Sequence, residues 1–238
     1  MSNAYQNPFV LAAEASQLDR SQFLRRTYAH LAGAILAFVA LEAVLIPTVG
    51  PMMTNLMVGM QYSWLIVLGL FMGASWLAQK WALSGTSLST QYAGLGLYVV
   101  AEAIIFIPIL TIASRMAATD PSQRTLIPAA GMLTIGLFLG LTAIVVTTKK
   151  DFSFLGGILK IGGFVAMGFI VASIVFGFNL GNLFAAIMVL FAAGAILYQT
   201  SAIFNQYSTG QYVAAALGLF ASVALLFFYI LRILMSRR

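Results

Sequence analysis

The sequence predicts an all-α membrane protein, built as a bundle of seven transmembrane helices. Charged residues make up only 8% of its 238 residues, and the mean hydropathy is +0.98. Crossing a bilayer takes about 20 apolar residues in a helix, and backbone groups inside the bilayer must be hydrogen-bonded internally. Seven apolar stretches approach or reach that length, at about 27–46, 62–79, 91–113, 126–147, 158–177, 181–204 and 211–234.

Charged or turn-forming residues bound each stretch. Arg25-Arg26 precede the first, and linkers rich in Pro, Gly, Ser and Asn follow the first three. The last two connections are so short that they predict antiparallel neighbours. We expect residues 1–20 to form a polar N-terminal tail and residues 21–238 to form one helical domain. The tail has no basic start or short apolar core typical of a cleavable signal, so the first span is expected to act as its own insertion signal.

Composition also excludes several functions. The net charge is +6, but the basic residues lie at the span ends in ones and twos rather than on one face, which argues against nucleic-acid binding. There is no cysteine and one histidine, His30, so thiolate chemistry and multi-histidine zinc or haem sites are excluded. The spans contain no His-Glu-x-x-His motif and no close acidic pair. We expect no enzyme activity, no cofactor and no firm metal site.

Glu102 is the most informative single residue. It lies at the midpoint of 91–113, where a carboxylate costs about 2.5–3.5 kcal/mol on insertion scales. It is therefore interpreted as an ion or proton site, or as a neutral acid hydrogen-bonded to another helix. Pro108 removes a backbone donor in the same stretch and predicts a kink there. Glu42 is a second acidic candidate, although it is close enough to the end of its span to reach the interface.

A motif between two spans resembles the BAX inhibitor-1 (transmembrane BAX inhibitor motif) family. It reads Thr147-Thr148-Lys149-Lys150-Asp151-Phe152-Ser153-Phe154-Leu155-Gly156-Gly157, with Lys149, Lys150, Asp151, Gly156 and Gly157 as its family positions. The segments 23–28, 98–110, 196–200 and 212–234 resemble the family's first, third, sixth and seventh helices. The similarity covers about 20–235.

This resemblance implies a bundle with the last helix at its centre, and a leak pathway for calcium or another cation that opens with pH. In the family, that gate uses two aspartates, one near the end of the sixth helix and one inside the seventh. The matching positions here are Gln199 and Ser222, neither of which titrates. We therefore expect either conduction without the aspartate-pair gate or loss of calcium conduction, with Glu102 and Glu42 as the remaining acidic groups.

An alternative function follows from the same resemblance. Bacterial members associate with, and restrain, a membrane-bound AAA+ protease that degrades membrane proteins, which implies a regulatory binding protein. For that role the N-terminal tail would matter more than the interior acids. The short loops fit a bacterial inner membrane. Arg25-Arg26 abut the first span while the following loop 47–61 carries no charge, which favours a cytoplasmic N-terminus.

Overall fold

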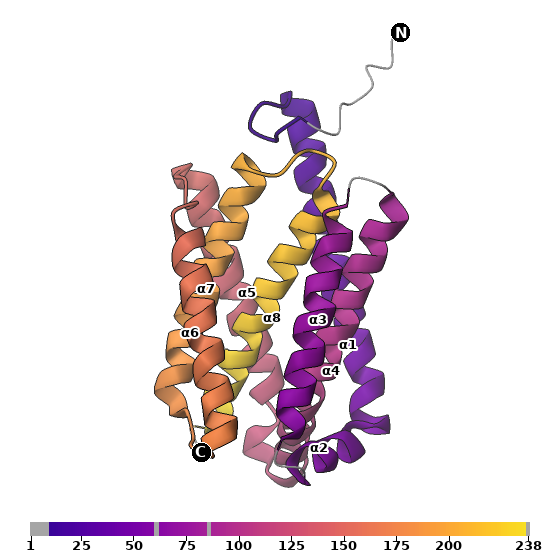
Figure 1. The fold of residues 1–238 in the computed structure, drawn as a ribbon, viewed down its shortest axis with the longest axis vertical. Helices are drawn as coiled ribbons and strands as arrows, with labels where there is room; N and C mark the ends of the chain where they lie inside the picture. The colour runs from indigo at the N-terminus through magenta and orange to yellow at the C-terminus, as the bar shows by residue number, and fades with distance from the viewer. Residues whose placement is uncertain (1–9, 60–61, 85–86, 237–238) are drawn as a thin grey trace.

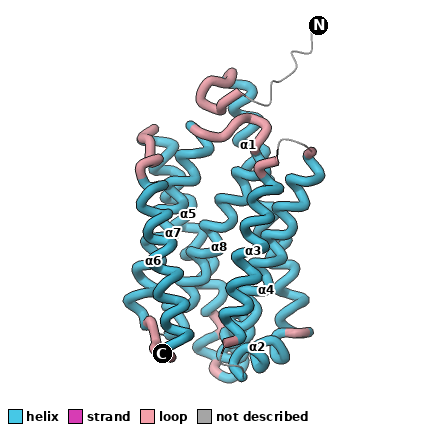
Figure 2. The backbone as a smooth tube through the Cα atoms, viewed as in Figure 1, coloured by secondary structure: helices cyan, strands magenta, loops and turns pink. Residues whose placement is uncertain are grey.

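The computed structural model describes residues 10–59, 62–84 and 87–236, and within them the fold is helical (Figure 2). Seven described helices are long and apolar enough to cross a membrane, which confirms the predicted class. They are α1 (Gln17–Thr48), α3 (Ser63–Ala82), α4 (Leu88–Thr119), α5 (Leu126–Thr148), α6 (Leu155–Phe176), α7 (Gly181–Asn205) and α8 (Tyr212–Ser236).

Three helices, α1, α4 and α6, begin earlier than the apolar stretches predicted, and polar residues cap the first two. The Ser16 side chain accepts a hydrogen bond from the Asp19 backbone N–H, so α1 begins at Gln17. Ser87 caps α4 in the same way through the Thr90 N–H. A side chain that satisfies a free N–H group at the first turn lets a helix start in polar sequence. The helices therefore extend beyond the hydrocarbon region that hydropathy detects.

The linker predicted at 47–61 is not simply a turn, because it contains the short helix α2 (Gly50–Gly59). Its proline, Pro51, stands in the first turn, where no intrahelical N–H bond is lost. α2 packs against α4 at one end of the bundle (Figure 1). At Gly50 an added Cβ would lie 2.5 Å from the Thr111 hydroxyl oxygen, so the glycine lets the backbone of α2 pack on that side chain of α4.

The last helix lies at the centre of the bundle, as the resemblance implied. α8 runs between α1, α3 and α4 on one side and α5, α6 and α7 on the other (Figure 1). In its most apolar window, 72% of residues are buried, against 6% in α6. A helix that is buried on most of its surface is apolar on most of its faces, as α8 is.

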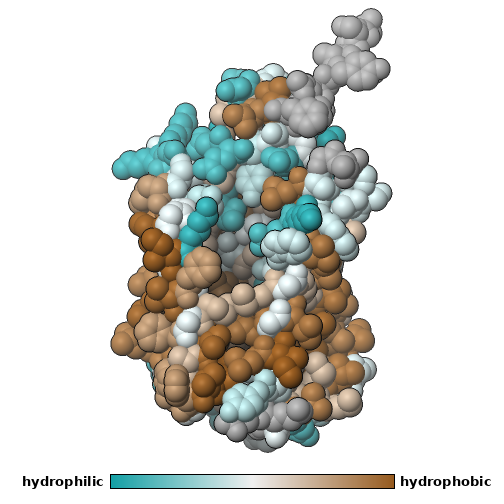
Figure 3. Space-filling view, viewed as in Figure 1, coloured by the Kyte–Doolittle hydropathy of each residue, from teal (hydrophilic) through white to brown (hydrophobic). Residues whose placement is uncertain are grey.

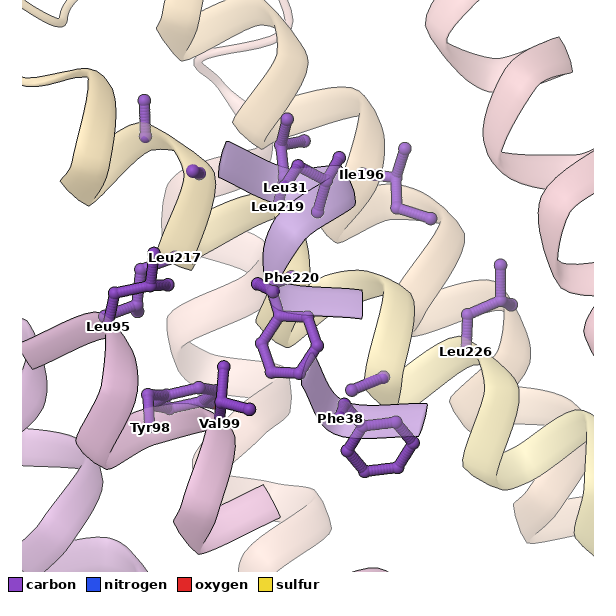
Figure 4. Close-up of a cluster of buried hydrophobic side chains, with 14 of the residues drawn as sticks. Leu31, Phe38, Leu95, Tyr98, Val99, Ile196, Leu217, Leu219, Phe220 and Leu226 are labelled. Atoms are coloured by element: carbon purple, nitrogen blue, oxygen red, sulfur yellow. The ribbon is translucent and has the colours of Figure 1, made fainter. Parts of the chain in front are cut away.

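Aromatic rings hold the centre together (Figure 4). The Phe220 ring of α8 lies 6.1 Å from both the Tyr98 ring of α4 and the Phe38 ring of α1, in edge-to-face arrangements. Phe38 also meets Phe106 edge-on at 5.1 Å. Such pairs contribute about 0.5–1.5 kcal/mol each beyond buried area. They lock α1, α4 and α8 into one unit.

Candidate functional site

A groove with a volume of about 830 Å³ runs along α8 between the two groups of helices. Its walls come from α3 and α4 on one side and from α6 and α7 on the other. It extends from Tyr207, in the connection between α7 and α8, to Asn179, in the connection between α6 and α7. We call these the Tyr207 end and the Asn179 end. α3 and α6 barely touch, and Figure 3 shows this face of the molecule hollowed between them.

Glu102 lines this groove from α4. Its side chain is only 6% exposed and is hydrogen-bonded to the Tyr98 side chain, one helical turn earlier. Tyr98 lines the groove as well, and its phenol O–H can donate to a carboxyl oxygen of Glu102. The acid predicted to need a polar partner thus has one on its own helix, and it stands at the wall of an internal cavity.

Gln199 and Ser222, the positions matching the family's aspartates, lie against the same turn of α8. An added Cβ on Gly218 would lie 2.7 Å from the Gln199 Oε1 atom, so the amide packs directly over that glycine. The Ser222 hydroxyl donates to the Gly218 carbonyl at 3.0 Å. Gln199 Oε1 is buried and has no hydrogen-bond partner among the described residues. Both side chains line the groove with Glu102.

Glu42 is placed elsewhere. It lies on the buried face of α1, one turn beyond Phe38, and is only 4% exposed. Both of its carboxyl oxygens lack a hydrogen-bond partner among the described residues. It is not among the groove-lining residues. Pro108 is buried within α4, which continues without interruption to Thr119.

Residues 151–153 of the family motif connect the α5–α6 connection to α7 through hydrogen bonds, and we call this set of bonds the latch. The Asp151 Oδ1 atom accepts hydrogen bonds from the Ser153 N–H at 2.9 Å, from the Ser153 hydroxyl and from the Ser201 hydroxyl at 3.1 Å. The Phe152 N–H donates to the Ser201 oxygen at 2.9 Å. The bonds from Ser153, followed by that from Ser201, hold the pKa of Asp151 below its usual value.

The remaining residues of the motif lie in different structural environments. Lys149 ends α5 in the left-handed conformation, with φ of 52°, and Lys150 is exposed. An added Cβ on Gly156 would lie 2.9 Å from the Tyr198 ring, whereas one on Gly157 would meet nothing within 4 Å. The latch lies at the Tyr207 end and outside the groove lining. It joins the α5–α6 connection to α7.

A backbone pairing that the sequence did not predict covers the Tyr207 end. The Ala12 N–H donates to the Tyr207 carbonyl at 2.9 Å, and the Thr209 N–H donates to the Val10 carbonyl at 3.0 Å. Residues 10–12 are thus hydrogen-bonded to the connection between α7 and α8, and we call this pairing the strap. Burial raises the pKa of the Tyr207 phenol to about 12, so Tyr207 stays neutral where it lines the groove. No pattern in the polar tail signals this pairing.

No group of three His, Cys, Asp or Glu side chains suited to a metal ion occurs among the described residues. The fold and the groove define a polytopic helical membrane protein in which the buried Glu102 lines a groove along the central helix. The chain belongs to the BAX inhibitor family, because the family model described as "Inhibitor of apoptosis-promoting Bax1" matches residues 20–238.

Three relatives illustrate the breadth of this family. The chain is 33% identical over 228 residues to an uncharacterized protein of Pseudomonas aeruginosa, covering 93% of this chain and 92% of that one. It is 31% identical over 225 residues to the "Modulator of FtsH protease YccA" of Escherichia coli, covering 92% of each. Protein lifeguard 4 of Mus musculus is 29% identical over 116 residues, covering 46% of each. No solved structure matches significantly.

Proposed function

We propose that the groove is a pathway for calcium or another cation, with Glu102 as its acidic group and without a carboxyl-pair gate. The observation that supports this is the convergence of Glu102, Gln199 and Ser222 on one cavity that extends between the two ends of the bundle. Carboxylate, amide and hydroxyl oxygens are the ligands that hard cations take in proteins. Glu102 supplies the charge, and the two neutral side chains supply further oxygens.

The absence of aspartate at 199 and 222 determines how pH acts on this pathway. Two close carboxylates share a proton and change charge with pH. An amide and a hydroxyl keep the same charge at every physiological pH. Because Gln199 packs on Gly218 and Ser222 bonds to the Gly218 carbonyl, the pair is held by packing rather than by a shared proton. Flux is therefore expected to lack a steep pH-controlled opening.

Calcium flux into proteoliposomes tests the role of Glu102, with Glu42→Gln as a matched control. Both changes neutralise a buried acid, but only Glu102 lines the groove. A unit charge about 4 Å from a carboxylate is stabilised by about 4 kcal/mol at an effective dielectric of 20. Glu102→Gln should lower flux by tenfold or more, whereas Glu42→Gln should leave it within about twofold. Equal loss in both variants, or none in either, would refute the assignment.

Restoring the missing carboxylates tests the gate separately. Gln199→Asp combined with Ser222→Asp should make the flux depend steeply on pH, because the two acids would face the same turn of α8. The control is Gln199→Ala with Ser222→Ala, which should stay pH-insensitive. A steep pH response in the unmodified chain that survives the double alanine change would show that another group operates the gate.

A second candidate function is modulation of a membrane-bound AAA+ protease. It is favoured by the Escherichia coli relative, whose name states that role and which covers 92% of this chain. The surface available for such a partner includes the polar region at the Tyr207 end, where residues 10–12 are strapped to the bundle. Deleting residues 2–9 leaves those contacts in place. Loss of co-purification with the protease, with flux unchanged, would assign binding to the N-terminal segment.

A further inference from the structure

The groove has two halves of different chemistry. Toward the Tyr207 end polar side chains lie among apolar ones such as Leu83 and Leu217; the polar ones are Gln79, Tyr98, Glu102, Gln199 and Ser222. Toward the Asn179 end the lining is mainly apolar and comes from α6, α8 and the start of α3, including Leu68, Met167, Ile170, Ile174, Leu225 and Phe228. The same division appears on the surface, where hydrophilic residues gather at the upper end of Figure 3 and hydrophobic ones cover the lower part.

The apolar half opens sideways, between α3 and α6. These helices barely touch each other, and Phe178, which lines the groove from the connection after α6, is 45% exposed. In a membrane this side faces the hydrocarbon of the bilayer. Water needs two to four polar partners to be held in a cavity, and this half offers few. Hydrocarbon is the medium that matches its lining.

The shape of the groove favours a narrow occupant. The groove has a volume of about 830 Å³ and follows α8 from the Tyr207 end to the Asn179 end. A flexible acyl chain is narrow enough to lie between α3 and α6 along α8.

A cation stands at the Asn179 end of this apolar half. Arg232, in the last turns of α8, lines the groove and is only partly exposed. Arg232 forms no ion pair with a carboxyl group among the described residues. Tyr229, three residues earlier on α8, lies close to it. A guanidinium binds phosphate through two parallel hydrogen bonds. Trp64, also on the groove, is of the type that settles at the headgroup level.

We propose that an acyl chain of an anionic phospholipid occupies the apolar half of the groove and that Arg232 binds the phosphate of its headgroup. The chain closes the sideways opening between α3 and α6, so that the polar half communicates with the Tyr207 end alone while the lipid is bound. This binding does not depend on cation flux, and it is measured without calcium.

Native mass spectrometry of the full chain tests the proposal, after purification into a detergent that contains equal amounts of phosphatidylglycerol and phosphatidylcholine. One phosphatidylglycerol should remain bound in preference to phosphatidylcholine. Arg232→Gln should reduce that preference by about tenfold or more, as expected for a charge-assisted hydrogen bond. Arg115→Gln is the matched control, because it removes the same charge from an exposed residue of α4 at the same end of the bundle.

A second pair of variants tests the acyl-chain half. Ile170→Trp fills the groove from α6, whereas Ile158→Trp adds the same bulk to a residue of α6 that is 60% exposed and outside the groove. The first should abolish retention and the second should not. Inorganic phosphate should not displace the lipid. Equal loss in Arg115→Gln and Arg232→Gln, or retention in both Arg232→Gln and Ile170→Trp, would overturn the proposal.

Discussion

Gly94 should be the glycine in α4 that the bundle tolerates least when replaced by alanine. An added Cβ there would lie 2.5 Å from the Ala78 carbonyl oxygen and 2.8 Å from the Ala82 nitrogen, both backbone atoms of α3. Moving the carbonyl from 2.5 Å to the 3.4 Å of an ordinary contact requires α3 and α4 to separate by about 0.9 Å. Backbone atoms of a packed helix cannot rotate away as the tip of a side chain does.

The size of the effect follows from two opposing contributions. Alanine favours a helix over glycine by about 1 kcal/mol, whereas overpacking that shifts backbone costs typically 1–3 kcal/mol, occasionally more. Because the clash involves backbone atoms, we take the overpacking cost as about 3 kcal/mol. Subtracting the gain in helix preference, we expect Gly94→Ala to lower the free energy of unfolding by about 2 kcal/mol. In a chain of this size, that corresponds to a fall in melting temperature of about 4–8 °C.

Gly96→Ala provides the control on the same helix. Its added Cβ would meet nothing within 4 Å, so only the gain in helix preference remains and the melting temperature should hold or rise. Thermal unfolding of both variants in one detergent, followed by circular dichroism or a dye-free fluorescence scan, gives the comparison. If Gly94→Ala proves as stable as Gly96→Ala, the close packing of α3 on α4 inferred from these distances is wrong.

Three further outcomes are expected. Gly156→Ala should destabilise the chain by about 1 kcal/mol because its Cβ would lie 2.9 Å from the Tyr198 ring, whereas Gly157→Ala should be neutral; their melting temperatures check this. Ser201→Ala should cost about 1–3 kcal/mol by leaving the Phe152 N–H unpaired, and hydrogen exchange at that amide should accelerate. The pKa of Asp151 is lowered in the folded chain, so its carboxylate stabilises the fold at neutral pH, and this contribution is lost only as pH falls below about 4. Asp151→Asn should therefore flatten that part of a curve of stability against pH.

Hydropathy was sufficient to predict the seven spans, because an apolar stretch long enough to cross a bilayer must form a helix there. The ends were harder to predict, although Ser16 and Asp19 carried a capping signal that the apolar pattern hides. α2 was missed because Gly50, Pro51 and Gly59 are typical of turns. Its helix is stabilised by packing on α4, which no local pattern records.

The candidate site was also only partly predictable from the sequence. Glu102 stands out in the sequence because a charge at membrane depth is rare, and the resemblance supplied Gln199 and Ser222. That these three share one cavity while Glu42 does not depends on how α1, α4, α7 and α8 rotate about their own axes. Uniformly apolar helices carry little information about that rotation. The strap between residues 10–12 and the α7–α8 connection is a backbone pairing, to which side-chain identity contributes little.

The central position of α8 has a consequence for how the bundle is made. α8, which packs against α1, α3, α4, α5 and α7, is also the last of the seven spans to be synthesised. Until it inserts, Phe38 of α1 lacks its contact with Phe220, and Phe106 of α4 lacks its contacts with Phe227 and Phe228. The packing of α1 and α3 on α4, and of α5 and α6 on α7, does not involve α8, so the two groups of helices are joined chiefly once it inserts. Final assembly is therefore a late event, set by the arrival of this single helix.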